Sequence, residues 1–115
     1  MIQIKRVYAP ALKQDGERVL VDRLWPRGLT KEKAKIDFWV KDIAPSDHLR
    51  KWFGHQPQKW PEFKKLYFHE LSMHKDALKP LIAEAKKEKI TLLYGAKDEW
   101  FNNAVALKEY IERKL

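Results

Sequence analysis

The residue types best suited to chemistry are gathered between Asp22 and Gly28. This segment reads Asp-Arg-Leu-Trp-Pro-Arg-Gly and follows the apolar run Val19-Leu20-Val21. Guanidinium groups bind phosphate or carboxylate through paired hydrogen bonds, and an indole stacks on flat groups. The structural alternative is that Arg23 pairs with an acid while Trp25 fills the core. The segment predicts an anion-binding site to which at least one of its two arginines contributes.

Three further candidates lie between residues 46 and 55. Ser46 begins a predicted helix, whose free N–H groups could bind an anion, although a plain N-cap is the commoner role. Arg50 lies beside the apolar stripe of that helix, so it could reach the same cleft or make a surface ion pair. His55 follows Gly54 in a loop, where it could act as a general acid or base or as a structural hydrogen-bonding group.

The last candidates follow the apolar run 90–94. Asp98 could handle protons or cap a helix, and Asn103 lies at the edge of an apolar helix face, turned toward the cleft. Asn102 points away from that face and is predicted to be solvated. We therefore assign proton handling to Asp22, His55 and Asp98. The predicted ligand-binding residues are Arg23, Trp25, Arg27, Ser46, Arg50, Tyr94, Lys97 and Asn103.

Other chemistries lack their residues. The chain has no Cys, which removes disulfides, thiolate metal sites and thiol nucleophiles. A zinc helix beginning at His69-Glu70 needs its second His at position 73, which is Met73. The four Gly residues form neither a P-loop nor a dinucleotide fingerprint. We predict neither a metal nor a cofactor.

The net charge of +8 allows two interpretations, a polyanion-binding surface or ordinary solubility. Of the 24 basic residues, 18 are Lys, scattered along the chain among 16 acids. Scattered Lys is typical of solvated faces, whereas Arg suits paired anion recognition. We expect no specific nucleic-acid binding.

These candidates must be positioned by an α/β fold. Strands are predicted at residues 2–8, 18–25 and 90–94, and residues 36–43 fit either a strand or an irregular segment. Helices are predicted at 31–35, 46–54, 57–71 and 76–87, with a last one whose apolar face runs from Trp100 to Leu115. Trp25 to Gly28 fits a type I turn.

Strands separated by helices indicate a single domain over residues 1–115, a three-layer α/β/α sandwich with a small, mostly parallel sheet. Residues 19–24 and 90–94 are predicted to be neighbouring parallel strands. Their carboxyl ends then share one edge of the sheet, so the three candidate segments should converge on one cleft. With neither a signal-peptide layout nor an apolar run of roughly 20 residues, the chain is expected to be cytoplasmic and free of membranes.

The chain resembles the YeaO-like family of small bacterial proteins of uncharacterised function. The motifs that carry the resemblance are Val21-Asp22-Arg23-Leu24-Trp25-Pro26-Arg27-Gly28, then Ala44-Pro45-Ser46 through Leu49-Arg50 to Trp52-Phe53 and His55, then Leu92-Leu93-Tyr94 through Asn103-Ala104. The resemblance implies an α/β fold and a bacterial cytosolic setting, and it implies no reaction.

Two functions remain open, with a third behind them. The leading hypothesis is an enzyme or binding protein for a small anionic or nucleotide-like molecule. The alternative is a basic nucleic-acid-binding module, and the third is a small interaction protein without pocket chemistry. The pattern leaves the oligomeric state open.

Overall fold

The computed structural model describes residues 1–115 and contains a four-stranded, all-parallel sheet in the order β1-β4-β2-β3. The strands are β1 (Ile2–Arg6), β2 (Glu17–Leu20), β3 (Phe38–Trp39) and β4 (Ile90–Tyr94). Every residue of β4 is buried, because this strand lies between β1 and β2. β2 and β4 pair in parallel, with Val19 opposite Leu92, so the predicted pairing of these two strands is confirmed.

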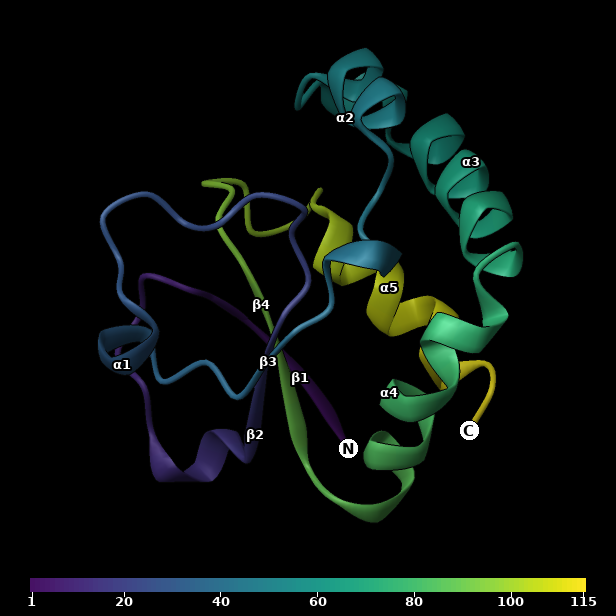
Figure 1. The fold of residues 1–115 in the computed structure, drawn as a ribbon. Coiled ribbons are helices and arrows are strands. Elements are labelled where there is room, and N and C mark those ends of the chain that lie inside the picture. Colours follow the sequence, from purple (N-terminus) through teal and green to yellow (C-terminus); the bar gives the residue numbers. More distant parts are fainter.

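Five helices cover the sheet unequally. They are α1 (Lys31–Ala34), α2 (Asp47–Phe53), α3 (Trp60–Ser72), α4 (Lys75–Lys87) and α5 (Asn103–Glu112). Short 3₁₀ turns span Lys13–Asp15, Lys41–Ile43 and Pro57–Lys59. Figure 1 shows α3, α4 and α5 on one side of the sheet and α1 on the other, with α2 beyond the end at which β4 finishes.

The sheet also divides the hydrophobic core into two clusters of unequal size. The larger cluster packs side chains of β2 and β4, such as Val19 and Leu92, against the buried faces of α3, α4 and α5. The smaller cluster contains Val7, Leu20, Ala34, Ile36 and Leu93. The α/β class with a parallel sheet is confirmed, but one of its two helical layers is thin, consisting of α1 and the loops around it.

Local side-chain and backbone signals set the helix ends, including the predicted N-cap at Ser46. The Thr30 hydroxyl accepts from the Lys33 N–H at 3.1 Å, and the Ser46 hydroxyl accepts from the Leu49 N–H at 3.1 Å. Gly54 ends α2 in the left-handed region with φ of 53°, which glycine adopts without a Cβ clash.

Two strands end earlier than predicted, and one turn is displaced. β1 ends at Arg6 instead of Tyr8, and β2 ends at Leu20 instead of Trp25. Residues 36–43, for which both a strand and an irregular segment were open, contain the two-residue β3 and a 3₁₀ turn. The tight turn lies one residue later than predicted: Leu29 N–H donates to the Pro26 carbonyl at 3.4 Å. Gly28 is therefore its third residue, and its φ of 81° is the conformation of a type II turn.

The last helix is shorter than its apolar periodicity, from Trp100 to Leu115, predicts. α5 begins at Asn103, so Trp100 precedes it and is 76% exposed, and Leu115 lies beyond its end. No helix in the chain has the length and apolar character that crossing a bilayer requires.

Candidate functional site

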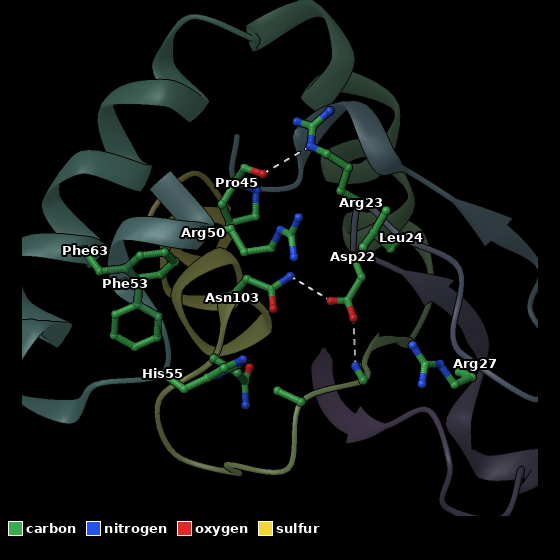
Figure 2. Close-up of a pocket in the computed structure, with 13 residues that line it drawn as sticks. Asp22, Arg23, Leu24, Arg27, Pro45, Arg50, Phe53, His55, Phe63 and Asn103 are labelled. Carbon is green, nitrogen blue, oxygen red and sulfur yellow. Dashed lines mark hydrogen bonds between the residues drawn. The ribbon is translucent and has the colours of Figure 1, made fainter. Parts of the chain in front are cut away.

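A cavity of about 540 Å³ lies at the carboxyl edge of the sheet, where the chain leaves β2 and β4 (Figure 2). Parallel strands present their carboxyl ends together, and α2 stands over the same edge. We call it the Asp22 cavity. Its lining residues are Asp22, Arg23, Leu24, Arg27, Pro45, Arg50, Phe53, His55, Phe63, Gly95, Ala96, Asn102 and Asn103.

Asp22 is the one acidic residue of the lining. Its Oδ2 accepts from the Gly95 N–H at 2.8 Å and its Oδ1 accepts from Asn103 Nδ2 at 3.0 Å. A Cβ on residue 95 would lie 3.2 Å from Oδ2, so glycine there allows the close approach. Burial raises the pKa of Asp22, while the hydrogen bonds from Asn103 and Gly95 and the charges of Arg50 and His55 act in the opposite direction.

Arg23 is committed to holding the chain that leads into α2. Its Nε donates to the Pro45 carbonyl and its Nη2 to the Ala44 carbonyl, both at 3.2 Å. Asp47 lies 3.9 Å from Nε. Two of its five N–H donors are therefore used within the protein, and Figure 2 shows its guanidinium turned toward Pro45.

Arg27 and Arg50 are the more available cations of the cavity. The Tyr8 hydroxyl fixes the Arg27 backbone by donating to its carbonyl at 2.9 Å, whereas the Arg27 guanidinium has no hydrogen-bond or ion-pair partner in the chain. Arg50 Nη2 donates to Asp47 Oδ1 at 3.1 Å, and the Arg50 side chain is 44% exposed. In Figure 2 both side chains border the space in front of Asp22.

His55 occupies the junction between the Asp22 cavity and an adjoining hollow. It follows Gly54 with a φ of 57°, a left-handed conformation that is uncommon for a residue with a Cβ and that recurs at ligand sites. Its ring centroid is 6.1 Å from that of Phe53. The adjoining hollow is lined by Arg6, Tyr8, His55, Gly95, Ala96, Lys97 and Asp98.

Six predicted residues thus line the Asp22 cavity, namely Asp22, Arg23, Arg27, Arg50, His55 and Asn103. Lys97 and Asp98 lie in the adjoining hollow. The Asp98 carboxylate accepts from the N–H groups of Trp100 at 2.8 Å and Phe101 at 3.0 Å, and the bonds from Phe101 and Trp100 lower its pKa. Asp98 therefore holds the turn that precedes α5, while the helix-capping role that was its structural alternative belongs to Asn102.

Three predicted residues lie outside both hollows. Trp25 turns toward the thin layer, where its Nε1 donates to the Leu29 carbonyl at 2.7 Å and its ring meets Trp39 edge-on at 5.3 Å. Tyr94 is 3% exposed because it belongs to the core face of β4. The Ser46 hydroxyl caps α2 and donates to Glu70 Oε2 at 2.7 Å. Trp25 and Tyr94, although predicted to bind ligand, are consequently absent from the lining of the cavity.

Sequence reasoning missed several lining residues. Asn102 was expected in solvent but is 2% exposed, because its Oδ1 caps α5 at Val105 N and its Nδ2 donates to the Asp98 carbonyl. The signal was present, since Asn is a favoured N-cap. Phe53 and Phe63 form the apolar side of the cavity in place of Trp25 and Tyr94, and their stacking at 4.4 Å gave no sequence signal.

A carboxylate cluster was also missed, at the opposite edge of the sheet. The side chains of Glu17 at the start of β2 and of Glu84 and Glu88 near the end of α4 lie within 4.8 Å of one another. Glu17 Oε2 is fully covered and has no hydrogen-bond partner. Burial raises the pKa of Glu17 to about 7, and the neighbouring carboxyl groups of Glu88 and Glu84 act in the same direction.

Comparison with known proteins gives a match along the full chain. The DUF488-N3i family model, described as the inactive DUF488-N3 subclade, matches residues 1–115. The uncharacterized protein YeaO of Escherichia coli is 46% identical over 110 residues, which cover 96% of each chain. Uncharacterized proteins of Mycobacterium tuberculosis and Mycobacterium bovis are 46% identical over 70 residues, covering 61% of this chain and 59% of theirs. No solved structure matches.

Proposed function

The chain belongs to the DUF488-N3i family, and on that premise we propose that it binds a small phosphate- or carboxylate-bearing molecule in the Asp22 cavity. The family is described as an inactive subclade, which favours binding over turnover. We therefore assign binding roles, not bond-breaking ones, to the polar residues of the cavity.

The unpartnered guanidinium of Arg27 carries this proposal. The cavity lining holds three arginines and a single carboxylate. Arg23 is already bonded to backbone carbonyls, but Arg27 has all its donors free and Arg50 shares only one with Asp47. Guanidinium groups bind carboxylate and phosphate oxygens through paired hydrogen bonds, so Arg27 and Arg50 can each bind an anionic group of the ligand.

The size and the apolar side of the cavity favour a molecule as large as a nucleotide. Ligand pockets commonly enclose roughly 300–1,000 Å³, and the Asp22 cavity has about 540 Å³. Leu24, which is 60% exposed, supplies apolar surface against which a flat ring can pack, whereas Phe53 and Phe63 behind the lining are almost fully buried. A nucleotide-like ligand would place its ring there and its anion at Arg27 and Arg50.

Thermal unfolding with inorganic pyrophosphate and with nucleoside monophosphates tests the proposal. A ligand at about 100 times its Kd adds about 2.7 kcal/mol of stability, which raises the Tm of a domain of this size by several degrees. We expect such a shift in the wild type and its loss in Arg27→Ala and Arg50→Ala.

The matched control is Arg113→Ala. Arg113 follows α5 and pairs with Glu109 at 3.0 Å. Its replacement removes the same charge far from the cavity, so the ligand-induced shift in Tm of this variant should equal that of the wild type. Equal losses in all three variants would indicate a general charge effect, and absence of any shift with these anions would overturn the proposal.

A further inference from the structure

We propose that the ligand of the Asp22 cavity carries a nitrogen donor group in addition to its anion, and that Asp22 and Asn103 bind this donor at the inner end of the cavity. The inference rests on the proposed function and adds a second recognition element to it. It distinguishes an acceptor pair, Asp22 and Asn103, from the arginines that bind the anion.

The Asp22 carboxylate has acceptor capacity left over. A carboxylate offers about four lone-pair sites, and the protein fills one on each oxygen, through Gly95 and Asn103. No cationic side chain forms an ion pair with it. Arg50 and His55 act on this half-buried charge only through space, so a donor or cation that arrives from the cavity can still form a direct hydrogen bond with it.

Asn103 supplies a second acceptor beside the first. Its Nδ2 donates at 3.0 Å to both the Val21 carbonyl and Asp22 Oδ1. Both partners are acceptors, so the amide nitrogen must face them and the amide oxygen must face away. This Oδ1 receives no hydrogen bond from the chain, and Figure 2 shows it turned from Asp22 into the space toward His55.

Two adjacent acceptors with no donor between them select for N–H groups. A protonated amine has three donors, and the amino-substituted edge of a purine has two or more. An anion at this end would instead meet the Asp22 charge and be repelled. The ligand is therefore an anion that also bears an amino group, either an α-amino acid or an amino-substituted purine nucleotide.

Matched ligand pairs test this inference without any variant. Guanosine and inosine monophosphates differ by one amino group, and so do glutamate and glutarate. We expect the amino member of one pair to bind the wild type at least tenfold more tightly in calorimetric titration, and the pair that discriminates identifies the source. Equal binding within both pairs, or binding of pyrophosphate alone, would overturn the inference.

Variants then locate the discrimination. In Asp22→Asn, and separately in Asn103→Ala, the preference for the amino member should fall to within about twofold, while Arg27-dependent binding of pyrophosphate persists. Glu99→Gln is the control, because it removes a nearby exposed carboxylate that does not line the cavity. Preference that survives in both cavity variants would also overturn the inference. Failure of pyrophosphate to bind would instead count against the proposed function itself.

Discussion

Asp15 and Arg18 form the one ion pair whose two side chains are both buried, with 0% and 4% exposure. Arg18 Nη1 lies 2.6 Å from Asp15 Oδ2, and its Nη2 donates to the Ala34 carbonyl at 2.8 Å. Lys5 Nζ lies 3.1 Å from the same carboxylate. This cluster ties β1, β2 and the end of α1 together.

Replacing Asp15 by Asn should destabilise the fold by about 3–5 kcal/mol, because Arg18 would keep its buried charge without a counter-charge. Urea unfolding at pH 7 measures the change, and Glu32→Gln, at an exposed position on α1, should leave the midpoint within about 0.5 kcal/mol of wild type. A midpoint for Asp15→Asn within that same margin would contradict the prediction.

Acid should weaken the fold through the same residue. Burial alone raises the pKa of Asp15, but the hydrogen bonds from Leu12, Lys5 and Arg18 outweigh it and leave the pKa below the ordinary 3.8. The stabilisation is therefore complete above that value and is lost as pH falls through the lower folded-state pKa. Wild-type stability should decline steeply at low pH, and Asp15→Asn should show a shallower decline.

The N-terminus of α2 is fixed by a side chain of another helix, α3. Glu70 of α3 accepts from the Ser46 N–H at 2.9 Å and from its hydroxyl at 2.7 Å, while that hydroxyl caps Leu49. Ser46→Ala should cost about 1–2 kcal/mol in unfolding free energy. Anion-induced shifts in Tm should be unchanged, and their loss would restore Ser46 as a ligand residue.

The carboxylate cluster between β2 and α4 predicts a stability that falls toward alkaline pH. The pKa of Glu17 rises from 4.5 to about 7 on folding, so its favourable contribution is complete below 4.5 and lost as pH rises through 7. Glu17→Gln should therefore gain Tm relative to wild type at pH 8 and not at pH 5. Glu112→Gln, at the exposed end of α5, should show the same difference from wild type at both values.

Element types were predictable where one physical signal dominates. The short apolar run 90–94 is typical of a central strand that is buried on both faces, and β4 has those bounds. The prediction extended β2 beyond its end at Leu20. Val21 still donates to the Leu93 carbonyl at 3.1 Å, and the chain leaves the sheet after it. The apolar periodicity did not show that α5 begins at Asn103. The predicted position of Asn103 beside the cavity was therefore right, whereas the prediction that Asn102 is solvated was wrong.

The site was predictable in outline for a topological reason. Polar residues after two adjacent parallel strands must emerge at one edge, and six of the predicted residues line one cavity there. Their individual directions were not predictable, because Trp25 and Arg27 lie beyond the regular ladder, where the turn at Gly28 decides which face each takes. Their roles in binding stay predictions.

At the scale of the whole molecule, the charge of +8 leaves the nucleic-acid alternative to be tested. We expect labelled duplex DNA and single-stranded RNA to be retained only at low salt, because scattered lysines neutralise few phosphates together. Fluorescence anisotropy at about 50 and 150 mM salt measures this dependence. Tight binding at the higher salt, with preference for one sequence or form, would favour the nucleic-acid module.

The central position of β4 has a consequence for how the protein is made. β1 has no other neighbour in the sheet, so Arg6 must wait for Tyr94, 88 residues later, which is roughly 4 to 18 s of ribosomal synthesis. Until then β2 has only the two-residue ladder to β3. Asp22 likewise waits for Gly95 and Asn103. A nascent or truncated chain that lacks β4 and the start of α5 therefore has neither the complete sheet nor the binding cavity. A ligand of this cavity can stabilise only the chain that contains both.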